Sequence, residues 1–291
     1  MRDRPLLIAA IAAPLILAFT TMPAQAAEYG WLRGSCESGS GIYRWSDGNR
    51  YEGGCRNDFF EGRGTLYLNN GDRYEGSFSK DAKNGFGTYH FANGDRFEGQ
   101  FQNGKRNGRG SLYRANGERY FGNYQEDRKA GQGSYYFLNG DRYEGNWTAD
   151  LFAGQGSYYY NNGDEYAGQW EAGEKHGRGE FKWTNGNRYE GHFRNGIQHG
   201  EGTKYWANGD RYEGQWRDDA MNGQGTFFYA NGNRFEGTFR QNQIHGQGTY
   251  YFYNGDRYVG PCRGERDGPG IYYDAKGNSK QMEFRGGRRV T

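Results

Sequence analysis

Three histidines occupy one position of a repeated pattern and could, by residue type, bind a metal ion. His176 and His199 lie 23 residues apart, and His245 lies two copies further along. If each copy supplies two strands, equivalent positions in adjacent copies lie about 9.6 Å apart, whereas zinc lies about 2.1 Å from a ligand nitrogen. One zinc ion therefore cannot bridge two of these histidines, and we interpret all three as structural. The sequence predicts no metal site and no cofactor.

Arginine and glutamate rows could provide a second kind of chemistry. Both rows come from the same repeated phrase, so we expect a surface ladder of ion pairs, each contributing roughly 0–1 kcal/mol. An arginine row that meets phosphate or carboxylate groups is the alternative. Because the same residues recur in every copy, no place is unlike the others, and we expect no catalytic residues and no enzyme. The rows are Arg50, Arg73, Arg96, Arg119, Arg142, Arg188, Arg211 and Arg234, with Glu52, Glu75, Glu98, Glu144, Glu190, Glu213 and Glu236.

Aromatic side chains form two columns on opposite faces of the expected strands. A single-layer sheet cannot bury both faces unless it curls, so we expect one column inside the curl and the other at least partly exposed. Exposed rings at a regular rise are a candidate binding surface, and packing on each other as cross-strand ladders is the alternative. One column holds Tyr67, Tyr113, Tyr136, Tyr159, Tyr205, Phe228 and Tyr251, and the other holds Leu66, Tyr89, Leu112, Tyr135, Tyr158 and Tyr250. The candidate binding surface combines Tyr67, Tyr113, Tyr136, Tyr159, Tyr205 and Tyr251 with Arg73, Arg96, Arg142 and Arg211.

The three cysteines suggest one possible disulfide. Cys36 lies in the loop of the first copy and Cys55 lies on the first strand of the second copy, so the two could pair and staple the N-terminal end. Cys262 occupies the position equivalent to Cys55 nine copies away, which is too far for a bond between those two. Cys262 is either a buried free thiol in place of the usual Trp or Phe, or an intermolecular site.

The elements that must position these residues come from a 23-residue period. The phrase "NGDRYEG" appears unchanged at Asn70–Gly76, Asn139–Gly145 and Asn208–Gly214. Frames begin at Tyr51, Tyr74, Phe97, Tyr120, Tyr143, Tyr166, Tyr189, Tyr212, Phe235 and Tyr258. With a degenerate first copy, eleven copies run from Glu28 to about Ser279, and this periodicity is typical of a repeat architecture in which each copy contacts its neighbours.

Each copy predicts two short antiparallel strands. Asn93-Gly94 between two alternating runs indicates a type I′ hairpin turn, which needs positive φ at both central residues. The polar stretch Ser79–Asn84 is expected to be the return loop. Gly76 is expected to leave room for an aromatic ring from the neighbouring strand. The predicted fold class is therefore all-β, an elongated, twisted antiparallel β-hairpin array.

The two ends of the chain differ from the repeats. Residues 1–26 combine Arg2 and Arg4, an apolar run and Ala24-Gln25-Ala26, which together predict a helical secretory signal peptide. The protein is therefore expected to be exported from a bacterial cytoplasm, either to the periplasm or out of the cell. Residues 281–291 form a basic tail, and residues 27–280 form the array. A net charge of +2 without a basic block is not typical of a nucleic-acid-binding protein.

The copies resemble the MORN repeat (membrane occupation and recognition nexus). Two copies match its pattern closely: Tyr166–Arg188, "YAGQWEAGEKHGRGEFKWTNGNR", and Phe235–Arg257, "FEGTFRQNQIHGQGTYYFYNGDR". The resemblance covers nearly the whole of residues 28–279. The resemblance implies an extended, twisted β-array with a groove. It also implies roles in protein–protein contact and self-association, and in some members affinity for acidic phospholipids. Some relatives carry a kinase domain, and nothing in this chain corresponds to one.

The sequence thus favours a non-catalytic periplasmic or secreted scaffold that binds a protein partner or a second copy of itself. The alternative is a ligand-binding module, for acidic phospholipid head groups on the arginine row or for a cell-envelope glycan on the aromatic column.

Overall fold

The computed structural model describes residues 29–33 and 36–290. Every element assigned within these residues is a β-strand, and all pairings between the strands are antiparallel. The all-β hairpin array predicted from the sequence is therefore confirmed. The predicted signal peptide, residues 1–26, lies outside the described residues. The chain divides into two compact units, Met1–Arg128 and Lys129–Thr291.

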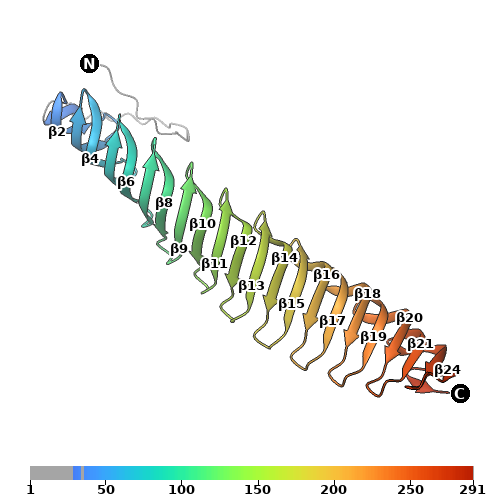
Figure 1. Cartoon of the computed structure of the whole chain (residues 1–291). Coiled ribbons are helices and arrows are strands. Elements are labelled where there is room, and N and C mark those ends of the chain that lie inside the picture. Colours follow the sequence, from blue (N-terminus) through green and yellow to red (C-terminus); the bar gives the residue numbers. More distant parts are fainter. Residues whose placement is uncertain (1–28, 34–35, 291) are drawn as a thin grey trace, which may run out of the picture. The chain divides into compact units, whose positions relative to one another are not determined.

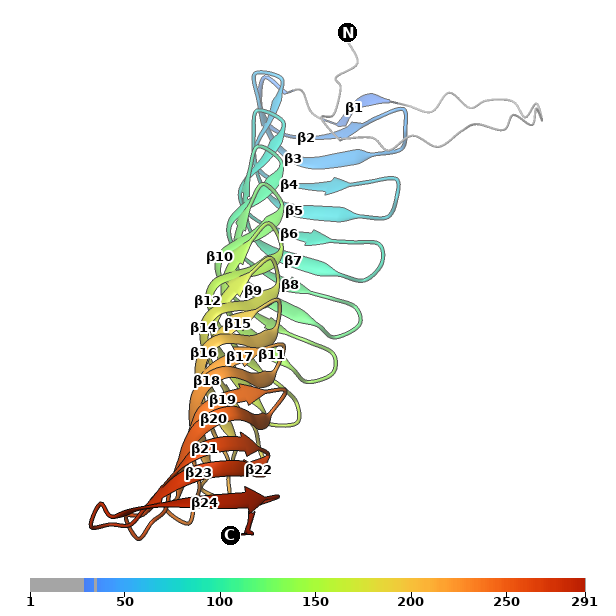
Figure 2. The ribbon, with the colours of Figure 1, turned by 90° about the vertical axis from the view of Figure 1, so that its right-hand side faces the viewer.

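The first unit is a sheet in which each strand pairs with the next along the chain (Figures 1 and 2). Hairpin loops follow one another along this sheet at both ends of its strands (Figure 2). Its strands are β1 (Gly30–Arg33), β2 (Ser38–Arg44), β3 (Arg50–Arg56), β4 (Phe59–Tyr67), β5 (Arg73–Ser79), β6 (Ala82–His90), β7 (Arg96–Gln102), β8 (Lys105–Tyr113) and β9 (Arg119–Gln125).

The second unit repeats the same arrangement. Its regular strands are β10 (Arg128–Tyr136), β11 (Arg142–Thr148), β12 (Leu151–Tyr159), β13 (Glu165–Glu171), β14 (Glu174–Lys182), β15 (Arg188–Arg194), β16 (Ile197–Tyr205), β17 (Arg211–Arg217), β18 (Ala220–Phe228), β19 (Arg234–Arg240), β20 (Gln243–Tyr251) and β21 (Arg257–Arg263). It ends with β22 (Glu265–Arg266), β23 (Gly268–Tyr273), β24 (Ser279–Arg285) and β25 (Arg288–Arg289). The predicted boundary between array and tail, at residues 280 and 281, thus falls inside β24.

The return connection between the strands of one copy is shorter than predicted. Ser79 pairs directly with Ala82, so only Lys80 and Asp81 form the loop. Both have positive φ, 48° and 67°, as a type I′ turn requires. The type I′ turn therefore lies at this end of the hairpin, within the stretch that the sequence assigned to a longer loop.

The Asn-Gly phrase forms a different turn from the one predicted. The N–H of Gly94 donates to the carbonyl of Phe91 at 3.0 Å, and the N–H of Phe91 donates to the carbonyl of Asp95 at 2.9 Å. Within this turn only Gly94 has positive φ, 89°. This is a three-residue hairpin loop, a type I turn followed by one left-handed residue. The prediction of a type I′ turn at Asn93-Gly94 is therefore wrong.

A bulge bends one strand of each hairpin. Gly76 pairs with Gly87 and Phe78 pairs with Lys83, so three residues of β6 face one residue of β5. Gly85, inside this bulge, has φ of 98°. Bulges of this kind bend a strand and increase its twist. The bend lets the sheet curl so that one of its faces, the inner face, closes on its own side chains.

The inner face carries a fully buried ring at the start of each repeat frame. Tyr74 has no exposed surface, and its hydroxyl donates to the carbonyl of Ser77 at 3.0 Å. A β-carbon added at Gly76 or at Gly87 would lie 2.4 Å from that hydroxyl oxygen. The ring above Gly76 therefore comes from Gly76's own strand, not from the neighbouring strand as predicted. The residues with no exposed surface at frame starts are Tyr51, Tyr74, Phe97, Tyr120, Tyr143, Tyr166, Tyr189, Tyr212, Phe235 and Tyr258.

A second row of rings completes this core. The ring of Phe78 lies 5.2 Å from the Tyr74 ring, and the ring of Phe101 lies 4.9 Å from it, both edge to face. The column that contains Leu66, Tyr89, Leu112 and Tyr135 lies on this inner face, because its members pair with the frame-start residues. The structure thus decides which of the two predicted aromatic columns lies inside the curl.

Side chains in the turns connect neighbouring copies at both ends of the strands. Asp72 accepts a hydrogen bond from the N–H of Ala92 and another from the hydroxyl of Tyr89, each at 2.8 Å. At the opposite ends of the strands, Asp81 accepts a hydrogen bond from the N–H of Phe60 at 2.7 Å. These acidic side chains satisfy backbone groups that a hairpin alone would leave unpaired. The acidic residue of "NGDRYEG" therefore joins one copy to the next.

Candidate binding surface

The face opposite the inner face, here called the outer face, carries the predicted tyrosines and arginines in an alternating column, which Glu165 and Lys182 interrupt between Tyr159 and Arg188. Arg142 lies between Tyr136 and Tyr159, and its guanidinium carbon lies 4.2 Å from the centre of the Tyr159 ring. The same distance is 4.5 Å for Arg50 and Tyr67, 4.6 Å for Arg96 and Tyr113, 4.2 Å for Arg188 and Tyr205, 4.1 Å for Arg211 and Phe228, and 3.9 Å for Arg234 and Tyr251. The sequence assigned these residues to separate rows, and the structure brings them together.

Arg73 differs from the other arginines in its neighbours. It lies opposite Tyr67 on one side and His90 on the other, because His90 replaces the usual tyrosine. The rings of the outer face are neither fully buried nor fully exposed. Tyr136 is 38% exposed, whereas Tyr67, Tyr113, Tyr159, Tyr205 and Tyr251 are half-buried. The rings therefore pack against arginines and still present part of their surface.

The arginines of the outer face also form ion pairs. Arg73 lies 3.0 Å from Glu75, Arg96 lies 3.4 Å from Glu98, and both side chains of each pair are at least a third exposed. Equivalent pairs join Arg142 to Glu144, Arg211 to Glu213 and Arg188 to Glu190. Exposed pairs contribute about 0–1 kcal/mol each. The arrangement is the predicted surface ladder, and it leaves these guanidinium groups with carboxylate and ring partners.

The histidines that share a repeat position lie beside separate carboxylates. His176 Nε2 lies 3.3 Å from Glu171, and His199 Nδ1 lies 3.8 Å from Asp218. Within residues 29–33 and 36–290, the structure has no group of three or more His, Cys, Asp or Glu residues that could hold a metal ion. In the same part of the chain, no helix is long and apolar enough to cross a membrane.

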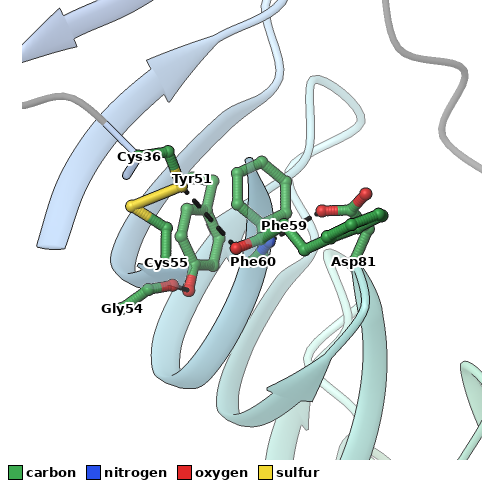
Figure 3. The surroundings of a disulfide bond; sticks show 7 residues. All are labelled: Cys36, Tyr51, Gly54, Cys55, Phe59, Phe60 and Asp81. Atoms are coloured by element: carbon green, nitrogen blue, oxygen red, sulfur yellow. Dashed lines mark hydrogen bonds between the residues drawn. A yellow bond between two sulfur atoms is a disulfide. The ribbon is translucent and has the colours of Figure 1, made fainter. Parts of the chain in front are cut away.

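The cysteines lie in two different environments. Cys36 and Cys55 form a disulfide with their Cα atoms 5.3 Å apart, next to the ring of Tyr51 (Figure 3). The surrounding contacts are the hydroxyl of Tyr51 donating to Gly54 at 2.7 Å and the N–H of Phe60 donating to Asp81 (Figure 3). Cys262 is a buried free thiol, and burial raises its pKa to about 11. The buried alternative therefore describes Cys262.

The inner face of the second unit carries a ladder of buried and half-buried rings, of which the sequence had indicated only Tyr135, Tyr158 and Tyr250. Tyr158 and Tyr160 have centroids 4.5 Å apart, Tyr160 and Phe181 5.7 Å, and Phe181 and Trp183 4.6 Å. The ladder resumes with Trp206 and Phe227 at 5.3 Å. Further members are Tyr135, Phe137, Tyr229, Tyr250, Phe252 and Tyr272.

Two lysines lie within this ladder and were also missed. Lys204 occupies the column that otherwise holds Leu, Tyr or Phe, and Lys175 lies over the ring of Phe181 at 4.7 Å. A comparison of the copies position by position would have found Lys204, because it is the one cation in its column.

A family model for the MORN repeat matches eleven segments of the chain. They are residues 37–50, 51–73, 74–96, 97–119, 120–142, 143–165, 166–188, 189–211, 212–234, 235–257 and 263–279. Their starts from 51 to 235 coincide with the frames read from the sequence, so the predicted repeat pattern is confirmed. No curated protein matches the chain.

Comparison with solved structures finds domains of CPAP and SAS-4 at low similarity. The TCP10 domain of Danio rerio CPAP, solved with a peptide of Danio rerio STIL, is 13% identical with a TM-score of 0.38, covering 85% of this chain and 99% of that chain. The TCP domain of Drosophila melanogaster SAS-4 (dCPAP), solved with a proline-rich motif of Ana2 (dSTIL), is 14% identical with a TM-score of 0.35, covering 62% of this chain and 99% of that chain.

Proposed function

Because the chain belongs to the MORN repeat family, we propose that it is a non-catalytic scaffold that binds a protein partner through its outer face. The observation that carries this proposal is the alternation of arginine and tyrosine along that face. Arg and Tyr are enriched among the residues that dominate binding energy at protein interfaces. Here the ring and the guanidinium hold each other in place, as in Arg142 and Tyr159 at 4.2 Å, so less conformational freedom is lost on binding.

Self-association is a part of the same proposal. A partner with the same outer face would meet alternating arginine and glutamate rows, which are complementary in charge when one copy is shifted against the other. The short edge strands β1 and β25 also limit uncontrolled pairing through sheet edges. Contact between outer faces would therefore be the route to a homo-oligomer.

We propose that the protein works outside the cytoplasm, in the bacterial periplasm or after secretion. The apolar N-terminal segment with its Ala24-Gln25-Ala26 ending supports export. A disulfide between Cys36 and Cys55 is consistent with an oxidising compartment. Cell fractionation and N-terminal sequencing would test this, with the mature chain expected to begin near Ala27.

The scaffold proposal is tested by cross-linking the whole exported chain to its partners in the native cell envelope. A variant that replaces Arg142, Arg188 and Arg211 by serine should lose the cross-linked partner. A matched variant, with serine replacing the exposed turn residues Gln241, Asp218 and Glu126, should keep it. Equal capture by both variants would place the contact elsewhere, and light scattering on purified protein would report self-association separately.

Binding of acidic phospholipids through the arginine row is a weaker candidate. The outer-face arginines already pair with carboxylates, as Arg73 does with Glu75, and membrane attraction requires clustered basic residues without such compensation. Flotation with vesicles that contain acidic lipid at low salt tests this directly.

A further inference from the structure

One position in the second unit breaks the repeat pattern. The inner-face column that contains Lys204 is otherwise apolar or aromatic. Trp206 follows Lys204 by two residues, and Trp183 occupies the position of Trp206 in the preceding copy. The corresponding column members are Leu66, Tyr89, Leu112, Tyr135, Tyr158, Phe181, Phe227, Tyr250 and Tyr272. A cation flanked by two indoles therefore occurs once, in an array whose other copies place a ring or a leucine there.

The geometry brings the cation and the indoles together. Lys204 Nζ lies 5.0 Å from the centre of Trp183, 5.5 Å from Trp206 and 5.9 Å from Trp216. Trp183 in turn contacts Phe181 at 4.6 Å, and Phe181 lies under Lys175 at 4.7 Å. Two lysines and the rings on either side of them thus share one part of the inner face.

The polar atoms of this cluster are left without protein partners. In the described residues, neither Lys175 nor Lys204 makes an ion pair or a side-chain hydrogen bond. The indole N–H groups of Trp183 and Trp206 likewise have no acceptor within the described part of the chain, whereas that of Trp216 donates to Gly202 at 3.0 Å. Burial lowers the pKa of Lys175 and of Lys204, and the charge of Asp219 nearby offsets this only in part.

Trp183, Trp206 and Lys204 are half-buried, so a ligand can reach them. We propose that these three residues, with Lys175, form a binding site for an acidic glycan, a sugar chain that carries carboxylates. The indole faces would stack on the apolar faces of successive sugars. The lysine amines would pair with sugar carboxylates in charge-assisted hydrogen bonds, and the free indole N–H groups would donate to ring or hydroxyl oxygens.

The repeat spacing and the backbone favour a glycan over a peptide. Trp183 and Trp206 occupy the same position in adjacent copies, about 9.6 Å apart for two strands, which is comparable to one disaccharide of an extended chain. A peptide that binds by adding a strand needs main-chain hydrogen bonds to a free sheet edge. Strands β14 to β17 are paired on both sides, so this face offers side-chain surfaces and no free edge.

The test is calorimetric titration of the whole chain with β-1,4-linked hexamannuronate. We expect binding, with the neutral analogue β-1,4-mannohexaose binding about tenfold more weakly. Lys204→Leu, which installs the leucine found at this position in two other copies, should weaken binding of the uronate by about tenfold and leave binding of the neutral sugar unchanged. Trp206→Leu should weaken binding of both sugars.

Lys83→Met is the matched control. Lys83 also lies over three rings, 4.7 Å from Tyr89, but in the first unit and without flanking indoles, and Met221 occupies its position in another copy. This variant should bind hexamannuronate as the wild type does. Circular dichroism melts would establish that each variant folds. Absence of binding to either sugar, unchanged binding by folded Lys204→Leu, or equally tight binding of a hexaglutamate peptide would each overturn the assignment.

Discussion

The ring of Tyr74 lies directly against Gly87 on the neighbouring strand, so closely that a β-carbon at Gly87 would lie 2.4 Å from the tyrosine hydroxyl oxygen. Tyr74 is fully buried and its hydroxyl is held by the carbonyl of Ser77, so the ring has no space into which it can withdraw. The same relationship links Tyr143 to Gly156 and Tyr166 to Gly179 in the second unit.

The first prediction concerns this contact. Gly87→Ala should lower the free energy of unfolding by about 1–3 kcal/mol or more, because overpacking a filled core forces rings and backbone to shift. Thr88→Ala, one residue along the same strand but on the outer face, should change it by less than about 0.5 kcal/mol. Urea melts followed by tyrosine and tryptophan fluorescence provide the measurement, and equal effects of the two substitutions would contradict the packing described.

Acid should weaken the contacts made by the acidic turn residues. Burial on its own would raise the pKa of Asp141, but hydrogen bonds from Tyr158, Asn161 and Asn139 outweigh it and the pKa is lowered. A carboxyl whose pKa is lowered by folding stabilises the native state above its ordinary pKa of about 3.9, and that stability is lost as the pH falls through the folded value.

We therefore expect the wild type to exceed Asp141→Asn in stability by roughly 1–3 kcal/mol at pH 7, the usual contribution of hydrogen bonds to a charged group. The difference should shrink as the pH falls from 5 to 3. Asparagine is a conservative replacement here, because Asn187 and Asn233 occupy the same position in other copies. A difference that stays constant with pH would show that the Asp141 charge contributes nothing.

Reduction should destabilise the N-terminal end. The Cys36–Cys55 disulfide spans 19 residues, and a loop of that size corresponds to about 3 kcal/mol in the chain-entropy account. Non-reducing peptide mapping should recover the linked pair, and a Cys36→Ser, Cys55→Ser double variant should melt like the reduced protein. A double variant as stable as the oxidised wild type would contradict this expectation.

Cys262 should react only after unfolding. Its thiol is buried and burial raises its pKa to about 11, so little thiolate forms at neutral pH and reagents cannot reach it. Titration with a thiol reagent should detect no free thiol in the native protein and one per chain in denaturant. Rapid labelling under native conditions would indicate an exposed or intermolecular cysteine instead.

The ring and the guanidinium of the outer face should be energetically coupled. A double-mutant cycle on Arg142→Ala and Tyr159→Ala should give a coupling of about 0.5–1 kcal/mol, as for an exposed cation over a ring. The same cycle on Arg142 and Tyr113, which belong to different contacts, should give a value near zero. No coupling between Arg142 and Tyr159 would mean that the stacked arrangement is not maintained in solution.

The sequence predicted the repeat frame because glycine and tyrosine recur with little variation, and the frame starts coincide with strand pairs in the structure. It did not predict the turn types. The pair Lys80-Asp81 lacks the type I′ signal, and Asn103-Gly104 and Asn195-Gly196, which carry that signal at the same place in other copies, lay inside the stretch assigned to a longer loop. The frame-start residues, Tyr74 and Phe97 among them, marked the repeat period in the sequence but were not predicted to form the core. Only the structure reveals that the carbonyl of Ser77 accepts the hydrogen bond of the buried Tyr74 hydroxyl.

The candidate binding surface on the outer face was predicted only in part. The tyrosines and arginines of the outer face were identified as rows, but their stacking depends on cross-strand register, which the misassigned turns obscured. Lys204 and its neighbouring indoles were not predicted, because the repeat pattern is defined by positions that recur and Lys204 departs from it.

The hydrogen bonds that run from one copy to the next have a directional consequence. Asp72 accepts a hydrogen bond from the loop of the following copy, while Asp81 accepts one from the strand of the preceding copy. Each two-stranded copy, or rung, is therefore hydrogen-bonded to two neighbours, and a terminal rung to only one. The Cys36–Cys55 crosslink clamps the first rung, and the other terminus has only β24 and β25 to close it. Peeling by heat or by force should accordingly start at the carboxyl terminus and advance rung by rung.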